Sequence, residues 1–277
     1  MPLIDVKLRL ISMLGLLTGV VIISLVLDYL HILRRPMRIG FGLALLGIIA
    51  GVALTLSAVL PENHIFGPVF SEVETAQKIV ALTFDDGPYP PYTGEILDIL
   101  KENHVPATFF VIGKNVEKHP ELIQRIVDEG HQLGNHTYNH VDLLKADRRT
   151  VADEIDKTNK AVADITGQAP KIVRPPHGFR DPVVMEVMAE RGLKVVEWSV
   201  MSRDWVNPGV EEIVDRTVKN VKNGSVILLH DGDGVAQAAS RAQTVEATRR
   251  IIRELAAQGY KFVTVDEILA KPEEEHK

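Results

Sequence analysis

The 277-residue sequence contains no cysteine. Disulfide bonds, thiolate metal ligands and a cysteine nucleophile are therefore excluded, whereas either a reducing or an oxidising compartment remains compatible with the sequence. Basic residues are outnumbered by acidic ones after the first seventy positions. Residues 1–70 hold five Lys/Arg and three Asp/Glu, which leaves 26 basic against 34 acidic residues for the remainder. That acidic excess argues against a nucleic-acid-binding protein.

Two N-terminal segments lack any charged residue. They are Leu10–Leu27, with 18 residues, and Ile39–Leu60, with 22 residues, whereas a membrane-spanning helix needs about 20 apolar residues. Neither segment has the polar face that a buried helix of a soluble protein usually shows. They predict a two-helix transmembrane hairpin, with spans at about 10–30 and 39–60. A cleavable signal peptide is the alternative, but the second segment is long and ends without a clear small-x-small cleavage pattern.

Positive charge between the two spans predicts the topology. The short loop holds Arg34, Arg35 and Arg38, whereas the segment before the first span holds Lys7 and Arg9. Loops rich in Lys and Arg remain in the cytoplasm, so we expect the turn of the hairpin inside and both termini outside. The protein is then a two-pass protein of the cell membrane with its folded domain on the extracytoplasmic side, and membrane lipid is one of its partners.

The rest of the chain alternates between short apolar runs and helical patterns. Residues 61–76 show no sustained periodicity and are interpreted as a linker, residues 77–270 as the folded domain and residues 271–277 as a charged tail. Apolar runs lie at 78–84, 107–112, 171–174, 194–199, 225–230 and 261–265, and helical periods lie at 92–103, 120–129, 148–166, 181–191, 210–221 and 241–258. This alternation predicts an α/β fold with parallel strands covered by helices.

The number of strand–helix units favours a barrel among the α/β folds. The domain is short for a complete eightfold barrel, so we predict a distorted, shortened (β/α) barrel, with an open doubly wound sheet as the alternative. In both folds the active site lies at the carboxyl ends of the strands. Five polar clusters follow apolar runs or lie between them: Thr83–Pro88, His136–His140, Arg174–Gly178, Asp204–Trp205 and Leu228–Asp231.

Two of these clusters hold candidate metal ligands. His136 and His140 are four residues apart, a spacing that lets two imidazoles converge on one ion. By itself this H-x-x-x-H pair is equally well explained by chance or by a capping role. Asp86 would complete a His2Asp set with an open position for water, as in catalytic metal sites. The adjacent Asp85 would repel Asp86 unless a cation or hydrogen-bond donors lie nearby, and a solvated Asp-Asp-Gly-Pro turn is the alternative.

Two other clusters hold candidates for charge pairing and proton transfer. Arg174 is followed by two prolines and could pair with a carboxylate such as Asp85, although a surface arginine before a turn would look the same. His230 follows the strongly apolar run 226–229, where an imidazole could donate a proton near neutral pH. A hydrogen-bonded core histidine is the alternative for His230.

Taken in order, T-F-D-D-G-P, H-T-x-x-H, R-P-P-x-G, D-W and L-x-H resemble the motifs of the polysaccharide deacetylases of the NodB-homology type, carbohydrate esterase family 4. The resemblance spans residues 78–270. It implies a distorted (β/α) barrel, hydrolysis of an N-acetyl group on a sugar, and one divalent metal ion, usually zinc, with cobalt or manganese as substitutes. By this resemblance Asp86, His136 and His140 are the metal ligands, Asp85 is the general base and His230 is the general acid.

The same resemblance assigns supporting roles to further residues. Arg174 would orient Asp85, and Asp204 would act in the same way on His230. Four residues would contact the substrate, two of them lining a pocket for the acetyl methyl group (Trp205 and Leu228) and two lying near the backbone N–H that stabilises the oxyanion (Pro176 and His177).

Two positions depart from the commonest family pattern. His177 stands where tyrosine is frequent, which could change the sugar ring that fits. Met201 stands where an aspartate often precedes the D-W motif, and Ser202 or Arg203 could fill that space near Asp204.

The implied function is a metal-dependent hydrolase that removes acetyl groups from N-acetylated sugars of a cell-surface polysaccharide, with peptidoglycan as the first candidate. An exopolysaccharide, a chitin-like oligomer and a lipid-linked sugar are alternative substrates. A non-catalytic carbohydrate-binding scaffold is disfavoured because no expected ligand, base or acid is lost. A membrane channel is disfavoured because the apolar segments offer only Ser, Thr and Gly as polar or small groups.

Overall fold

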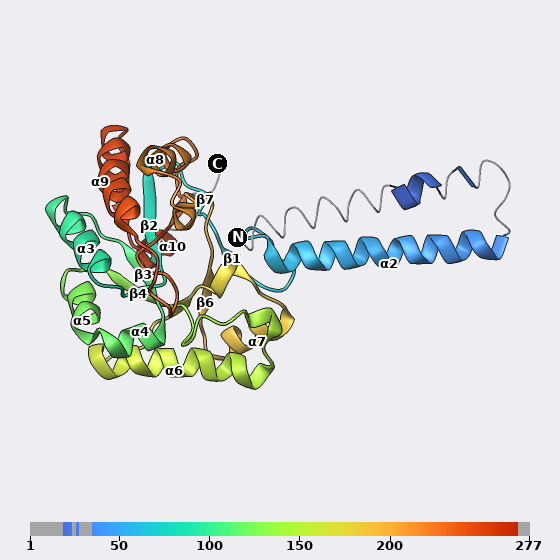
Figure 1. The fold of residues 1–277 in the computed structure, drawn as a ribbon, viewed down its shortest axis with the longest axis horizontal. Helices are drawn as coiled ribbons and strands as arrows, with labels where there is room; N and C mark the ends of the chain where they lie inside the picture. The colour runs from blue at the N-terminus through green and yellow to red at the C-terminus, as the bar shows by residue number, and fades with distance from the viewer. Residues whose placement is uncertain (1–18, 24–25, 28–34, 271–277) are drawn as a thin grey trace. The chain divides into compact units, whose positions relative to one another are not determined.

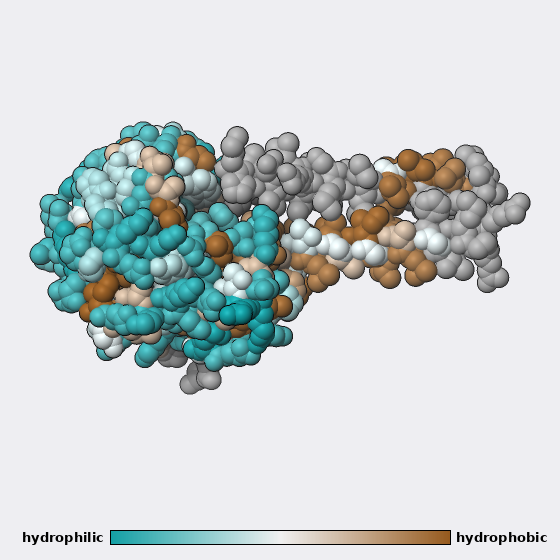
Figure 2. Space-filling view, turned by 60° about the horizontal axis from the view of Figure 1, so that its bottom comes forward, coloured by the Kyte–Doolittle hydropathy of each residue, from teal (hydrophilic) through white to brown (hydrophobic). Residues whose placement is uncertain are grey.

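The computed structural model describes residues 19–23, 26–27 and 35–270. Residues 19–23 and 26–27 are helical, and helix α2 (Arg35–Val59) follows. Within α2, the stretch Gly42–Val59 is long and apolar enough to cross a membrane, and it is the only such stretch in the described part of the chain. Its apolar side chains are largely exposed, as the brown surface of this helix in Figure 2 shows. The remainder of the first predicted span, most of the predicted loop and the tail 271–277 lie outside the described residues.

Residues from Val59 onward form a separate compact unit built on one parallel sheet (Figure 1). Its strands are β1 (Val69–Phe70), β2 (Ile79–Asp85), β3 (Thr108–Val111), β4 (Gln132–Asn135), β5 (Ile172–Val173), β6 (Lys194–Val196), β7 (Val200–Met201), β8 (Val226–His230) and β9 (Lys261–Val263). The strand order is β1-β6-β5-β4-β3-β2-β8-β7, with β9 paired to the first half of β2. Among the described residues, β1 and β7 are the two edge strands and do not pair with each other, so the sheet does not close. The domain is therefore a half-barrel, in agreement with the predicted shortened barrel.

Helices follow most strands and cover the outer face of the sheet (Figure 1). They are α3 (Tyr92–Glu102), α4 (Gly113–Lys118), α5 (Pro120–Asp128), α6 (Arg148–Thr166), α7 (Pro182–Glu190), α8 (Val210–Val218) and α9 (Ala242–Ala257). Helix α10 (Val265–Leu269) instead packs on the inner side, where Val265 and Ile268 share an apolar cluster with Ile79 and Ala81 of β2. Short 3-10 turns occur at Leu143–Lys145 (η1), Pro176–Gly178 (η2) and Asp204–Val206 (η3). All six predicted helical periods are found, with ends shifted by no more than a few residues.

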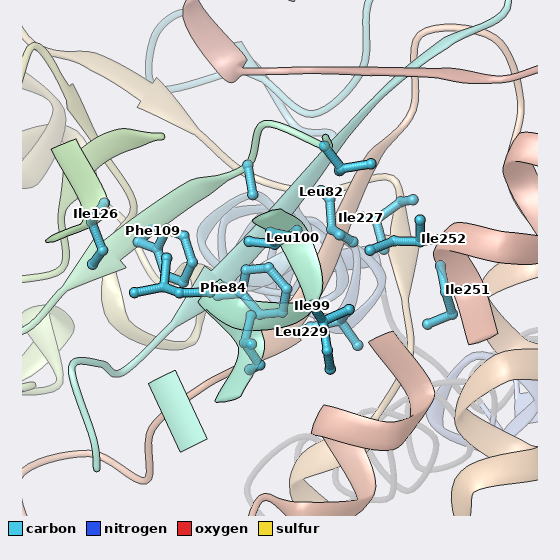
Figure 3. Close-up of a cluster of buried hydrophobic side chains, with 14 of the residues drawn as sticks. Leu82, Phe84, Ile99, Leu100, Phe109, Ile126, Ile227, Leu229, Ile251 and Ile252 are labelled. Carbon is cyan, nitrogen blue, oxygen red and sulfur yellow. The ribbon is translucent and has the colours of Figure 1, made fainter. Parts of the chain in front are cut away.

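The largest apolar cluster lies between the central strands and helices α3, α5 and α9 (Figure 3). Leu82 and Phe84 of β2 belong to this cluster, and Phe84 stacks on Phe109 of β3 with ring centroids 5.1 Å apart. Successive side chains of a strand point to opposite faces, so Thr83 and Asp85 point to the inner side. The whole of β2 is buried, which explains why a continuous apolar run ending in Asp85 identified it.

The segment predicted as a linker, 61–76, contributes to the fold. Val69 and Phe70 pair with β6 as strand β1, and Val69 is buried. Arg180 donates hydrogen bonds to the carbonyl oxygens of Leu60 and Asn63, at 2.6 and 2.8 Å. A two-residue strand leaves no periodic pattern in the sequence, so this contribution was not predicted.

We expect the domain to need this segment for stability. A protein that begins at Gln77 loses β1 and leaves the buried Arg180 guanidinium with fewer acceptors, which together should cost about 2–4 kcal/mol. Its melting temperature should lie roughly 5–15 °C below that of a matched protein that begins at Val59. Differential scanning calorimetry of the two proteins measures this difference, and equal melting temperatures would contradict the prediction.

Candidate active site

The carboxyl end of β2 presents two aspartates to the inner side of the sheet. Asp85 is the last residue of the strand and lies between Phe110 of β3 and His230 of β8 in the pairing register. Asp86 follows with a left-handed backbone, φ 77°. Its carbonyl oxygen accepts a hydrogen bond of 3.0 Å from Nδ2 of the buried Asn115. The two carboxylates have different neighbours: Arg174 contacts Asp85, and histidines contact Asp86. These neighbours reduce the repulsion that is expected between adjacent acids.

Asp86, His136 and His140 converge on one point. Oδ1 of Asp86 lies 3.1 Å from Nε2 of His140 and 3.5 Å from Nε2 of His136, and the three ligand atoms are within 4.8 Å of one another. Nδ1 of His136 lies 2.7 Å from the carbonyl oxygen of Arg174. A carbonyl can only accept, so Nδ1 carries the proton and the lone pair of Nε2 faces Asp86.

The electrostatics of this cluster suit a divalent cation. Burial opposes the charge of Asp86, but His140, His136 and His230 together with the backbone N–H of Gly234 outweigh it and lower the pKa of Asp86 to about 2. Burial lowers the pKa of His136 to about 4 against the attraction of Asp85. The ligand-forming states are therefore favoured, with an ionised carboxylate and a neutral imidazole. Oδ1 of Asp86 is buried and makes no hydrogen bond, and a metal ion bound by these three residues would satisfy it.

Arg174 is buried behind this cluster. Nη1 of Arg174 donates to Oδ1 of Asp85 at 2.7 Å and to Oγ1 of Thr83 at 2.8 Å. Nε and Nη2 donate to the carbonyl oxygens of Val196 and Glu197 at 3.1 and 2.9 Å. The predicted pairing of Arg174 with Asp85 is thus present in the structure, and the guanidinium is fixed on all sides.

A further buried acid lies behind the turn η2. Glu197 is fully buried, and burial raises its pKa to about 8 although Arg180 and Arg174 oppose the shift. Nη1 of Arg180 lies 3.5 Å from Oε1 of Glu197 and donates to the carbonyl oxygen of Gly178 at 2.8 Å. A Cβ atom on Gly178 would lie 2.7 Å from Oε2 of Glu197. The R-P-P-H-G turn therefore needs glycine at this position in order to pack on Glu197.

His230, at the end of β8, and Asp204, in η3, form a second charged pair. Nδ1 and the backbone N–H of His230 lie 2.9 and 2.8 Å from the two carboxylate oxygens of Asp204. Ser202 and Thr244 also donate to this carboxylate, at 3.0 and 2.8 Å. Burial lowers the pKa of His230, but Asp204 outweighs it and raises the pKa to about 9. His230 is therefore protonated near neutral pH. Of the two residues that could support Asp204 in place of an aspartate at position 201, Ser202 contacts the Asp204 carboxylate.

The four predicted substrate-contacting residues lie around these groups. The Trp205 ring meets the His230 ring edge-on at 5.2 Å. Leu228 is two residues before His230 on β8 and points to the same face of the strand. Pro176 and His177 lie in η2, where His177 has φ 62° and its ring lies 5.1 Å from that of His140.

Several residues of the site were missed by sequence reasoning. Thr83 begins the T-F-D-D-G-P motif, but the motif assigns it no role, and Thr244 and Asn115 lie in segments without a motif. Glu154 of α6 binds the loop between the two histidines. Thr244, Asn115 and Glu154 reach the site from distant parts of the chain, and nothing local in the sequence marks them.

An α/β half-barrel with a His2Asp cluster that could hold a metal ion, an Asp–Arg pair and an Asp–His pair at its carboxyl edge is an arrangement typical of hydrolytic enzymes. Residues 72–196 match the model of the polysaccharide deacetylase family. The chain is 43% identical over 206 residues to a peptidoglycan-N-acetylglucosamine deacetylase of Bacillus cereus, covering 73% of this chain and 93% of the relative. The chain belongs to the polysaccharide deacetylase family, carbohydrate esterase family 4.

Two further comparisons support this membership. A chitooligosaccharide deacetylase of Sinorhizobium fredii is 44% identical over 192 residues, covering 67% of this chain and 89% of the relative. The crystal structure of the Bc1960 peptidoglycan N-acetylglucosamine deacetylase in complex with a benzamide compound superimposes with a TM-score of 0.68 at 38% identity, covering 72% of this chain and 91% of that chain.

The His230–Asp204 pair predicts a pH dependence. The folded-state pKa of His230, about 9, exceeds its ordinary value of 6.5, so its contribution to stability is complete below about pH 6.5 and is lost as the pH rises through about 9. In Asp204→Asn the negative partner is removed, and the pKa of His230 should fall. NMR titration of the histidine ring signals measures both values, and an unchanged pKa in the variant would contradict the assignment of Asp204 as the cause.

Proposed function

We propose that the protein removes N-acetyl groups from the N-acetylglucosamine units of a cell-surface polysaccharide, with peptidoglycan as the natural polymer. The observation that carries this proposal is the convergence of three functional groups at the ends of β2, β4 and β8. These groups are a cation site, a carboxylate paired with arginine, and an imidazole paired with aspartate. Amide hydrolysis needs an activated water, a stabilised oxyanion and a proton for the departing amine.

Asp86, His136 and His140 would hold the divalent ion, with zinc as the first candidate and cobalt or manganese as substitutes. When bound, the ion supplies Lewis-acid polarisation of the water and of the amide carbonyl. His136 is prepared for this role by its hydrogen bond to the carbonyl oxygen of Arg174.

Asp85 is the proposed general base. Its Oδ1 is bound by Arg174, whereas Oδ2 lies 3.9 Å from Nε2 of His136 and thus faces the cation site. One carboxylate oxygen is therefore held, and the other is directed to where the attacking water would lie. Accepting the proton of that water raises its nucleophilicity as it attacks the acetyl carbonyl carbon.

His230 is the proposed general acid. Asp204 keeps its imidazole protonated and fixes the ring through Nδ1, which leaves the Nε2–H to donate to the amine nitrogen as the C–N bond breaks. Trp205 and Leu228 would line the pocket for the acetyl methyl group. Pro176 and His177 would contact the sugar near the oxyanion.

The choice of polymer rests on location and likeness. The relatives include both peptidoglycan and chitooligosaccharide deacetylases at nearly equal identity, so likeness alone does not separate the two. An enzyme anchored at the outer face of the membrane would meet the cell wall, which favours peptidoglycan. An exopolysaccharide, a chitin-like oligomer and a lipid-linked sugar are the alternatives.

We also propose that residues 1–60 anchor the protein as a two-pass hairpin, with the domain up to residue 270 on the extracytoplasmic side. Support comes from the apolar helix Gly42–Val59 and from the three arginines between the two uncharged segments.

Acetate release tests the enzymatic proposal. The full chain in detergent should release acetate from N-acetylglucosamine oligomers when zinc or cobalt is added and should lose this activity with a chelator. Asp85→Asn should lower kcat roughly 10²–10⁴-fold because it removes the base, whereas Asp98→Asn, an exposed acid on α3, should behave as the wild type. Metal binding without acetate release from any N-acetylated glycan would instead favour a carbohydrate-binding scaffold.

The absence of cysteine makes the topology directly testable. A single cysteine introduced as Glu62→Cys, in an exposed position after α2, should react with a membrane-impermeant maleimide on intact cells because it lies outside. The matched variant His31→Cys, in the predicted loop, should react only after lysis. Labelling of both variants on intact cells, or the reverse pattern, would contradict the hairpin.

A further inference from the structure

The loop between the two histidine ligands has an irregular backbone that the surrounding structure must hold. Thr137 and His140 have left-handed conformations, with φ of 65° and 56°. Such conformations cost non-glycine residues on the order of 1–3 kcal/mol each and persist only where neighbouring groups determine them. The direction in which His140 points is therefore set by whatever fixes residues 137–139.

A buried carboxylate from another element holds this loop. Oε2 of Glu154, on α6, accepts the backbone N–H groups of Tyr138 and Asn139 at 2.9 and 2.7 Å. Oε1 accepts Nδ2 of Asn139 at 2.6 Å. Glu154 is only 5% exposed, and it forms no ion pair with any residue in the described part of the chain. Its charge is thus balanced by three donors, all from the loop.

The beginning of the loop is tied to the same helix. Oδ1 of Asn135 accepts the N–H of Thr137 at 2.8 Å, and its Nδ2 donates to the carbonyl oxygen of Ile155 at 3.0 Å. On the other side, Gly113 and Lys114 of α4 donate to the carbonyl oxygens of Thr137 and Tyr138. The loop is therefore clamped between α4 and α6, and Glu154 supplies the clamp nearest to His140.

The two histidines differ in how their rings are held. His136 is oriented by the hydrogen bond from Nδ1 to the carbonyl oxygen of Arg174. For His140 no corresponding hydrogen bond from Nδ1 is found among the described residues, and the ring is half-buried between His136 and His177. The position of His140 hence depends on its backbone, which Glu154 fixes.

We propose that Glu154 is a positioning residue for His140 and sets the affinity of the site for its metal ion. This inference rests on the proposed function, because it takes Asp86, His136 and His140 as the ligands. Without the carboxylate, two backbone N–H groups lose their acceptor, and the loop can relax out of the left-handed conformation that directs His140 toward Asp86. Glu154 contacts neither the metal ion nor the substrate, and it nevertheless controls how fully the site is occupied by metal.

The test measures metal binding by the full-length protein. Titration of the metal-free protein with Zn²⁺ against a chromophoric chelator should give a Kd for Glu154→Ala about 10–100-fold weaker than for the wild type, the range typical when a group supporting a ligand is removed. Glu154→Gln should lose less, because its amide oxygen can still accept from the loop and Asn139 can turn its own oxygen to the new amide. Asp164→Ala removes an exposed acid of the same helix that pairs with Lys160 and should bind as the wild type does.

Activity provides a second readout that general destabilisation would not reproduce. For Glu154→Ala and Glu154→Gln, acetate release should be low at limiting zinc and recover when zinc is raised, whereas Asp85→Asn should not recover. Should the alanine variant fail to fold, as judged by melting without metal, the glutamine variant carries the test. Equal Kd values for the wild type and the two Glu154 variants would overturn this inference but leave the proposed function intact. If the wild type itself did not bind metal, the proposed function would be overturned as well.

Discussion

The buried guanidinium of Arg174 is the interaction on which the rest of the site depends. It is inaccessible to solvent and lies 4.1 Å above the Phe110 ring. Burying a cation costs several kcal/mol unless it is paired and hydrogen-bonded, and Asp85 provides the charge. The backbone carbonyl of the same residue orients His136. One residue thus fixes both the proposed base and a proposed ligand, so neither can move independently of the other.

A row of buried ionisable side chains continues behind Arg174. Glu197 lies between Arg174 and Arg180, and its raised pKa reflects burial that the two arginines offset only partly. Arg180 in turn is held by carbonyl oxygens of residues 60–63. The segment that follows α2 is therefore linked through the buried side chain of Arg180 to the turn of Gly178, beside the site. This continuity explains why a segment without sequence periodicity belongs to the folded domain.

Sequence patterns predicted those parts of the fold that are buried on both faces. Strands β2, β3 and β8 lie between helices and the inner side of the sheet, so they are continuous apolar runs. Strand β4 was missed because Gln132–Asn135 contains two amides and a glycine, although His136 directly after it was found by its spacing from His140. Glu154 could not be predicted, since a buried acid within a charged amphipathic helix resembles its exposed neighbours, and only the tertiary contact distinguishes it.

The conformation of Asp86 explains how two consecutive acids can serve one site. In a regular strand, side chains alternate between faces. Phe84 points outward into the apolar cluster and Asp85 points inward, so a continued strand would direct Asp86 outward to the helices. The left-handed φ of 77° interrupts the alternation and turns the carboxylate of Asp86 toward His136 and His140. Such a conformation costs about 1–3 kcal/mol. Asn115 offsets part of this cost by binding the carbonyl oxygen of Asp86, so a buried amide with no proposed part in the reaction helps the proposed base and the proposed metal ligand to share one edge of the sheet.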